Sequence, residues 1–544
     1  MKVASLPWLA IACLTGLLLM PASAWADEAE SLYTTDAVGA IELEIPPSSI
    51  AALEADPTGE YQPAQFKFAD TDGTPGGVGA YSAPIEVSVR LKGHVNGSFE
   101  PLSGKAAFKI KFKKSTPFRG LKKMTLNNMV EDRSMIHEAL TYTAFRAAGV
   151  PAPRTGYAFL RVNGEPYGVY LDIETLDKVA LEKQLGPFDE ETQHLYEGEY
   201  GADVVPGGAG AFEVDEGDEE DRSDLEALIA AVNAPSPPSY SERMAPVADL
   251  AELTRMWAVE KYIGRWDGYA GFHRSVNQPN NYYLYSDAAG RFQMLPWGSD
   301  ETWEMYYRLP FDEPDGLMFD KCLEDEACFG EYWKAVSSTS TTIAGLPLDA
   351  LATHLASVLQ PWQALDPRKP TSTEEIAAAV AEVRQFIAVR PGDAAVWLAD
   401  NAPAEIPSGT EEPPLAGGPA LVSGSTPAPL VSGSSSTTTP APRIHLLGPI
   451  EERGRHLHLE VRLSTPGWVR LDSERGSGLA EGAACFGARR FLAAGRRQIG
   501  CRISALTWRR LKSRSLSVTL RARFEAEAGP DQEAVRTIEL HKRT

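Results

Sequence analysis

A segment of low apolar content divides the chain and sets its domain organisation. Residues 401–442 consist mainly of proline, serine, threonine and glycine, and within them 420–425 echoes 429–434. A segment of this composition cannot bury enough apolar surface to offset the conformational entropy lost on folding, so we expect an extended linker. The 544-residue chain is therefore predicted to hold a large domain over 27–400 and a small one over 443–544.

The two predicted domains differ in charge. Residues 443–544 contain 20 Lys and Arg against 11 Asp and Glu, a formal charge of +9, and the chain total of −22 leaves −31 for the rest. This asymmetry supports separate domains, and the overall negative charge excludes a generally cationic nucleic-acid-binding protein. The hydrophobic fraction of 43% indicates packed cores rather than disorder.

The first 26 residues have the pattern of a secretory signal peptide. Lys2 supplies a positive charge, residues 6–20 are apolar and uncharged, and 24–26 form an A-x-A cleavage pattern. The apolar run is short for a bilayer span, which needs about 20 residues. We therefore expect cleavage after Ala26, a secreted or extracytoplasmic location at the periplasm or cell surface, and no integral membrane span afterwards. An uncleaved membrane anchor is the alternative.

Four cysteines outside the leader fall into two close pairs, Cys322 with Cys328 and Cys485 with Cys501. In an oxidising compartment each pair is predicted to form a local disulfide, with free buried thiols as the alternative. Neither pair has C-x₂-C spacing or a nearby histidine, so a zinc site is not expected.

Apolar periodicity predicts an α+β fold for the large domain. Asn163-Gly164 is a hairpin signal between two of the expected strands. The expected strands are 41–45, 66–69, 85–91, 108–112, 156–162, 167–173, 281–286 and 292–295. The expected helices are 48–55, 134–148, 176–184, 224–232 and 249–263, with further helices filling 340–400. The acidic, Gly-rich stretch 197–221 is interpreted as a solvated loop, with a low-affinity Ca²⁺ loop as the alternative.

The small domain is predicted to be an all-β sandwich of about 100 residues. Its expected strands are 457–463, 468–471, 498–503, 516–524 and 535–541. Three arginine pairs, at 489–490, 496–497 and 509–510, are interpreted as a solvated basic surface, with an anion-binding face for an acidic glycan partner as the alternative.

Several segments of the large domain follow one another in an ordered series. They are 89–93 (Val-Arg-Leu-Lys-Gly), 105–112 (Lys-Ala-Ala-Phe-Lys-Ile-Lys-Phe), 121–128 (Leu-Lys-Lys-Met-Thr-Leu-Asn-Asn), 132–149 with 151–154 (Pro-Ala-Pro-Arg), 162–170, 265–269 (Arg-Trp-Asp-Gly-Tyr), 280–285 and 295–300 (Leu-Pro-Trp-Gly-Ser-Asp). Taken together, from about residue 35 to 395, they resemble the CotH family of spore-coat-type protein kinases. The resemblance implies a divergent protein-kinase-like fold and ATP-dependent phosphorylation of secreted proteins.

The resemblance, joined to the needs of phosphoryl transfer, nominates residues for the nucleotide. Phe108, Ile110 and Phe112 alternate along one strand, so Lys109 and Lys111 share its opposite face. Lys109 is predicted to meet the phosphates. Further cofactor-binding candidates on this and the preceding strand are Lys111, Arg90 and Lys92. A solvated strand edge is the plainer alternative for the lysines.

The remaining candidates would hold the lysine, the acceptor and the metal. Glu138, in the helix after these strands, is predicted to pair with Lys109, and Asp267 to orient the incoming hydroxyl. Asn281 and Asp300 flank a hairpin that would bring them to one Mg²⁺ or Mn²⁺, whose preferred ligands are oxygens. The alternatives are a surface helix charge for Glu138 and a turn residue for Asp267.

Two departures from the family pattern qualify the resemblance. Family members often have Pro-Trp-Asp-x-Asp where this chain has Gly298 at the first acid, and no clean G-x-G-x-x-G loop is present. The predicted function is an exported kinase that phosphorylates Ser or Thr of a surface or coat protein. The alternative is a catalytically inactive, kinase-like surface binding or adhesion protein. No G-x-S-x-G or H-E-x-x-H signature favours a hydrolase.

Overall fold

The computed structural model describes residues 28–70, 79–93, 98–271, 279–308 and 310–403. It also describes segments 443–453, 456–464, 467–473, 485–491, 495–503, 516–526 and 532–540. The predicted signal peptide and nearly all of the predicted linker lie outside the described residues, so both stay predictions.

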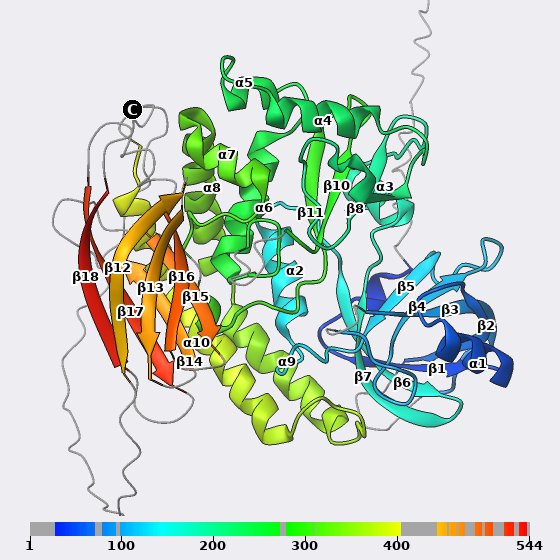
Figure 1. Cartoon of the computed structure of the whole chain (residues 1–544). Helices are drawn as coiled ribbons and strands as arrows, with labels where there is room; N and C mark the ends of the chain where they lie inside the picture. Colours follow the sequence, from blue (N-terminus) through cyan, green and yellow to red (C-terminus); the bar gives the residue numbers. More distant parts are fainter. Residues whose placement is uncertain are drawn as a thin grey trace, which may run out of the picture.

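Seven strands close into a barrel in the first part of the chain (Figure 1). β1 (Val38–Glu44) pairs in parallel with β6 (Thr155–Val162) to complete the order β1-β2-β3-β4-β5-β7-β6. The other strands are β2 (Gln62–Ala69), β3 (Ile85–Lys92), β4 (Ala107–Phe112), β5 (Lys123–Asn127) and β7 (Glu165–Ile173). Phe66, Val89 and Phe108 are among the side chains that fill its interior, as the period-two patterns predict.

The predicted hairpin turn is confirmed between β6 and β7. Asn163 and Gly164 both have positive φ, 51° and 83°, which two-residue type I′ turns require. The Asn163 side chain accepts a hydrogen bond from the backbone N–H of Ile45 at 2.7 Å, so the turn is also tied to the chain segment after β1.

A four-stranded antiparallel sheet with order β11-β10-β8-β9 lies in the helical part of the chain. Its strands are β8 (His194–Gly198), β9 (Phe212–Glu216), β10 (Tyr282–Ser286) and β11 (Phe292–Pro296). The prediction of a solvated loop over 197–221 was therefore wrong in part, because β9 and a short 3₁₀ helix, Gly208–Ala211, lie within it. Phe212 is buried and opens β9, although acidic neighbours mask its strand pattern.

Helices pack on this sheet and on the barrel and make up the rest of the domain (Figure 1). They are α1 (Pro47–Ala55, against the barrel), α2 (His137–Ala147), α3 (Lys178–Leu185), α4 (Ser223–Asn233), α5 (Tyr240–Met244), α6 (Leu250–Ile263), α7 (Leu317–Glu324), α8 (Glu326–Ala344), α9 (Leu348–Gln363) and α10 (Thr373–Asp400). Most of α6 is buried. Asp249 caps its start, and Gly264, in the left-handed conformation, ends it. The α+β class is thus confirmed.

Helix α2 begins three residues later than predicted. The Asp132 carboxylate accepts hydrogen bonds from the backbone N–H groups of Ser134, Met135 and His137. Because a side-chain acceptor satisfies these donors, the segment before His137 forms a turn rather than a first helical turn.

A buried ion pair joins the barrel to the helical part. Lys105 Nζ lies 2.6 Å from Asp366 Oδ2, and both side chains are almost fully enclosed. The same carboxylate accepts from the backbone N–H of Val169 at 3.0 Å. Gly168 (φ 109°) leaves room for it, since a Cβ there would lie 1.9 Å from Asp366 Oδ1. The loop between α9 and α10 is therefore anchored on β7.

The Cys322–Cys328 disulfide is present and links α7 to α8, as predicted. The side chains of Cys485 and Cys501 lie outside the described part of the chain, so that pair stays a prediction. No single helix in the described ranges is long and apolar enough to cross a membrane; α8 and α9 meet that test only as a pair bent by 52°.

The C-terminal segments form one seven-stranded sheet with order β12-β13-β16-β15-β14-β17-β18. These strands are β12 (Ile444–Arg453), β13 (His456–Leu463), β14 (Gly467–Ser473), β15 (Cys485–Phe491), β16 (Gly495–Ile503), β17 (Leu516–Ala526) and β18 (Gln532–Leu540). They cover the five predicted strands and add β12 and β15. The described strands belong to one sheet and show no second sheet packed against it. The sandwich therefore stays a prediction.

Candidate active site

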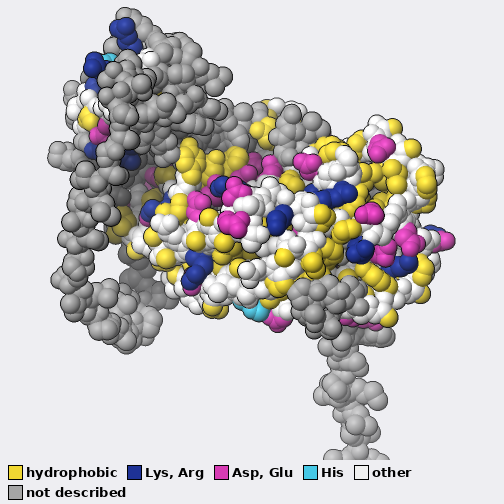
Figure 2. Space-filling view, turned by 90° about the horizontal axis from the view of Figure 1, so that it is seen from below, with side chains coloured by type: hydrophobic (Ala, Val, Ile, Leu, Met, Phe, Trp, Pro, Cys, Tyr) yellow, Lys and Arg dark blue, Asp and Glu magenta, His cyan; other side chains and the backbone are white. Residues whose placement is uncertain are grey.

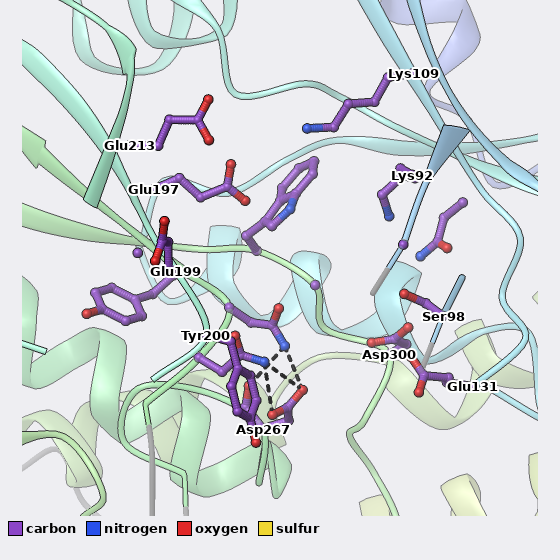
Figure 3. A pocket seen from close by; sticks show the side chains of 18 of the residues that line it. Lys92, Ser98, Lys109, Glu131, Glu197, Glu199, Tyr200, Glu213, Asp267 and Asp300 are labelled. Atoms are coloured by element: carbon purple, nitrogen blue, oxygen red, sulfur yellow. Dashed lines mark hydrogen bonds between the residues drawn. The ribbon is translucent and has the colours of Figure 1, made fainter. Parts of the chain in front are cut away.

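A cavity of about 630 Å³ lies between the barrel and the helical part. Its wall includes Lys92 and Lys109 from the barrel, Glu197 and Glu213 from the small sheet, and residues around the ends of β10 and β11 (Figure 3). Five of the eight predicted site residues line it: Lys92, Lys109, Asp267, Asn281 and Asp300. Residues far apart in sequence thus meet at one site.

The cavity carries more acidic than basic side chains. Its acids are Glu131, Glu197, Glu199, Glu213, Asp267 and Asp300, against Lys92 and Lys109. On the outer face seen in Figure 2, by contrast, acidic and basic side chains are interspersed. A cavity lined by one predominant sign of charge concentrates counter-ions, so this one favours cations or ligands that carry cations.

A buried ion pair holds the loop that carries Asp267. Arg265, two residues after the end of α6, donates to Glu260 and to the backbone carbonyls of Asn281 and Trp297. The Glu260 carboxylate also accepts from the backbone N–H groups of Tyr269 and Ala270, at 3.2 and 2.7 Å. Glu260 and Arg265 therefore fix both sides of the loop against the ends of β10 and β11.

Asp267 is positioned by two consecutive asparagines. Asn281 Nδ2 donates to Asp267 Oδ2 at 2.7 Å and to the Asp267 backbone carbonyl at 3.1 Å. Asn280 Nδ2 lies 3.2 Å from Oδ1 (dashed lines, Figure 3). Burial raises the pKa of Asp267 to about 6, opposed by the Asn280 hydrogen bond. With its nitrogen engaged, Asn281 has its amide oxygen turned away from Asp267.

Asp300 presents its carboxylate to the same cavity (Figure 3). The residue is only 9% exposed, and its backbone carbonyl contacts His137 Nδ1 at 2.6 Å. Within the described ranges no other residue donates a hydrogen bond to its carboxylate or forms an ion pair with it. Burial raises the pKa of Asp300, and the positive charge of Lys92 opposes this shift.

Lys109 reaches the cavity, but the predicted contact with Glu138 is absent. Burial lowers the pKa of Lys109, and the negative charges of Glu197 and Asp215 oppose this shift. Glu138 is buried behind the cavity wall, where it accepts from Asn127 Nδ2 and from the backbone N–H of Ser299 at 3.1 Å. Burial raises the pKa of Glu138 to about 7. The prediction of this contact used only the order of strand and helix along the chain, and that order does not determine which residue a helical side chain faces.

Arg90 and Lys111 do not line the cavity. Arg90 lies 4.9 Å and Lys111 4.5 Å from the centre of the Tyr61 ring, so both stack on that ring. Lys92, two residues after Arg90, lines the cavity instead, and its charge acts on both Glu138 and Asp300. Of the predicted cofactor-binding residues, only Lys92 and Lys109 therefore face the site.

Gly298 leaves space that Asn281 uses. Its φ is 52°, and a Cβ there would lie 2.6 Å from Asn281 Oδ1. A larger residue would therefore meet the Asn281 amide and would also adopt a strained backbone conformation. The absence of an acid at this position is linked to the orientation of Asn281.

Two observations fit a divalent cation. The buried Asp300 carboxylate lacks a donor from another described residue, and the amide oxygen of Asn281 is free of Asp267. Both are oxygen donors of the kind that Mg²⁺ and Mn²⁺ take. Among the described residues no group of three or more His, Cys, Asp or Glu could hold a metal ion. Any cation here would complete its coordination with water and substrate oxygens.

Sequence reasoning missed the acids of the small sheet and Glu131. Glu197 and Glu213 are cross-strand partners on β8 and β9, a pairing hidden within the stretch interpreted as a loop. Glu131 lies in the turn before α2, and no motif marked it. The sequence signal that could have placed Glu197 and Glu213 was the alternation of apolar and acidic residues at 212–216.

Comparison with known proteins places this site in a family. A family model described as "CotH kinase protein" matches residues 89–392, more than half of the chain. The chain therefore belongs to the CotH kinase protein family. The match covers every cavity residue named above and excludes β1, β2 and the C-terminal sheet.

Two curated relatives from Bacillus subtilis (strain 168) are similar to parts of the chain. Inner spore coat protein H is 24% identical over 242 residues, which are 43% of this chain and 63% of that protein. An inner spore coat protein H-like protein is 40% identical over 70 residues, 13% of this chain and 22% of that protein. The chain thus spans less than two thirds of the length of either relative.

Proposed function

We propose that this protein is an exported protein kinase with a divergent kinase-like fold, which transfers the γ-phosphate of ATP to Ser or Thr of a surface or coat protein. The observation that carries the proposal is the Asp267–Asn281 pair, fixed by hydrogen bonds in a cavity that also holds Lys92, Lys109 and Asp300. Phosphoryl transfer needs these parts: an acid for the acceptor hydroxyl, cationic groups for the phosphates, and oxygen ligands for a metal.

Asp267 is assigned to the acceptor hydroxyl. Its carboxylate lines the cavity, and the two asparagine amides restrict its rotation, so a hydroxyl that donates to it is held in one direction. The same carboxylate takes the proton that the hydroxyl loses on transfer. The Glu260–Arg265 pair is assigned an indirect, positioning role, because it holds the loop without contacting substrate.

Lys92 and Lys109 are assigned to the phosphates. Both ammonium groups project into the cavity from the barrel wall, where positive charge offsets the negative charge of a triphosphate (Figure 3). Asp300 and the amide oxygen of Asn281 would hold Mg²⁺ or Mn²⁺, which when bound neutralises phosphate charge. Glu138 is assigned a positioning role, through its hydrogen bonds to Asn127 and the Ser299 backbone.

Two separate observations support the proposed location and partners. The N-terminal pattern favours export, and the relatives' names place them in an inner spore coat. We propose a secreted or coat protein as the phosphate acceptor, and an acidic glycan as the partner of the basic C-terminal domain. Gly298 favours the second candidate function, a catalytically inactive binding or adhesion protein.

The deciding experiment incubates the purified protein with γ-labelled ATP and Mg²⁺ or Mn²⁺, beside Asp267→Ala and Asp300→Ala. Transfer to the protein itself or to a coat extract, reduced at least about a hundredfold in both variants, supports the kinase. No transfer with either metal, together with no nucleotide-induced rise in Tm, favours the binding protein. Transfer that persists in both variants would place the chemistry elsewhere.

A further inference from the structure

Glu131 and Asp300 present their carboxylates side by side on one wall of the cavity (Figure 3). They come from different elements, since Glu131 lies in the turn between β5 and α2 and Asp300 follows β11. Asp300 is the charged residue that acts most strongly on Glu131. Two segments more than 160 residues apart thus place two acids at one point.

Both carboxylates lack a compensating donor or cation among the other described residues. No other described residue donates a hydrogen bond to Asp300 or Glu131, and none forms an ion pair with either. Asp300 is nine-tenths buried. Lys92 acts on both acids but lies beyond ion-pair distance, so one lysine faces two acids. A buried carboxylate without a partner is costly unless a cation joins it.

The neighbouring segments offer few other oxygen ligands. Gly298 has no side chain, and Glu138 and Asp132 are buried and engaged with backbone donors. Two further acids near Asp300 are also engaged, since Glu301 accepts from Trp266 Nε1 at 3.0 Å and Asp267 accepts from Asn280 and Asn281. Asn281 contributes one amide oxygen at most, because its nitrogen is held by Asp267. A six-coordinate cation at Asp300 would therefore find its next carboxylate in Glu131.

We propose that Glu131 is a second carboxylate ligand of the divalent-cation site, acting together with Asp300. The cation belongs to the hard, oxygen-preferring class of Mg²⁺ and Mn²⁺. One part of the inference rests on the proposed function: the phosphate oxygens that complete the coordination belong to the nucleotide of the proposed kinase. The pair of acids itself binds the metal with or without phosphoryl transfer.

The test measures metal binding directly on the full-length protein. Mn²⁺ is titrated in the absence and presence of ADP, and free Mn²⁺ is followed by its electron paramagnetic resonance signal. The variants are Glu131→Gln, Asp300→Asn and Glu199→Gln. Glu199→Gln removes the same charge from another part of the cavity wall and so measures the general loss of negative potential. Melting temperatures establish that each variant is folded.

Glu131→Gln is expected to weaken Mn²⁺ binding at least about tenfold, Asp300→Asn by as much or more, and Glu199→Gln by less than about threefold. Label transfer from ATP, measured in parallel, separates the two claims. If the wild type transfers phosphate and Glu131→Gln binds Mn²⁺ like the wild type, the assignment of Glu131 is wrong and the kinase stands. If Glu131→Gln loses metal affinity and neither the wild type nor any variant transfers phosphate, Glu131 is a metal ligand and the proposed kinase function is wrong. A wild type that binds no Mn²⁺ overturns the assignment.

Discussion

Asn281 Nδ2 lies 2.7 Å from Asp267 Oδ2 and 3.1 Å from the backbone carbonyl of the same residue. One amide group therefore fixes both the main chain and the side chain of Asp267. It does so across 14 residues of sequence, from the start of a hairpin to the loop after α6. The geometry of Asp267 depends on the position of β10, and hence on the packing of the small sheet.

Removing this amide should disable the site without unfolding it. Asn281→Ala loses both hydrogen bonds to Asp267 together with the candidate metal oxygen. We expect label transfer to fall about a hundredfold, since small misplacements of a catalytic group have costs of that order. Asn280→Ala is the matched control, because it removes only contacts of 3.2 and 3.3 Å to the same carboxylate, and its loss should be about tenfold or less. Equal losses in the two variants would contradict this division of roles.

Glu252 makes the stability of the protein depend on pH. Its carboxylate is buried in α6 and accepts from the backbone N–H of Met294 at 2.9 Å, and burial raises its pKa to about 8 from an ordinary value of 4.5. The folded state then keeps a proton that the unfolded chain releases. The contribution of Glu252 to stability is therefore present at low pH and is lost as pH rises from 4.5 to about 8.

Glu252→Gln removes the pH dependence of stability that Glu252 causes, because the amide of the introduced glutamine stays neutral. Relative to the wild type, the free energy of unfolding of Glu252→Gln should rise with pH, by up to about 1.4 kcal/mol per pH unit. Urea denaturation between about pH 5 and about pH 8 measures the difference. Glu226→Gln, at an exposed position on α4, controls for the loss of a charge. A difference that does not change with pH would show that Glu252 is ionised in the fold.

Breaking the buried ion pair between Lys105 and Asp366 should destabilise the protein, because it leaves an uncompensated charge between barrel and helices. Asp366→Ala leaves the Lys105 ammonium buried without a partner and frees the Val169 N–H. We expect a loss of about 3–5 kcal/mol in the free energy of unfolding, measured by urea denaturation. The exposed pair Arg384–Asp349 supplies the control, since Asp349→Ala should change stability little. Similar losses in both variants would contradict the role of burial.

Local patterns in the sequence were sufficient for much of the fold. Alternation at Phe108, Ile110 and Phe112 placed the barrel strand and its lysines, and Asn163-Gly164 placed a turn whose two residues both need positive φ. Asn281 and Asp300 were predicted to be close because the two strands of a hairpin must pair. These inferences succeeded because each depends on interactions within a few residues or across one hairpin.

The contacts that the sequence did not indicate depend on how whole elements pack. The direction of Glu138 is set by where α2 lies against the chain after β11, so its partner is the Ser299 backbone rather than Lys109. Glu131 reaches the cavity through the same packing. Strand β9 was missed for a different reason, because three of its five residues are acidic and hide the apolar Phe212; one of them, Glu213, lines the cavity.

Gly298 allows a last test of how the site is built. Gly298→Ala and Gly120→Ala both place a Cβ on a residue with positive φ, 52° and 82°, so both should lose about 1–2 kcal/mol of stability through backbone strain. They differ in surroundings, since the new Cβ meets Asn281 Oδ1 at 2.6 Å in the first, whereas at Gly120 nothing lies within 4 Å.

Only Gly298→Ala should therefore displace the Asn281 amide from Asp267. We expect label transfer to fall at least about tenfold in Gly298→Ala and to stay near the wild-type rate in Gly120→Ala, with similar losses of stability in urea. Equal activity in the two variants would show that Asn281 adjusts without cost. A selective loss would mean that glycine at 298 is a requirement of the asparagine's orientation, so that the missing acid is part of how this site works and not a sign of lost function.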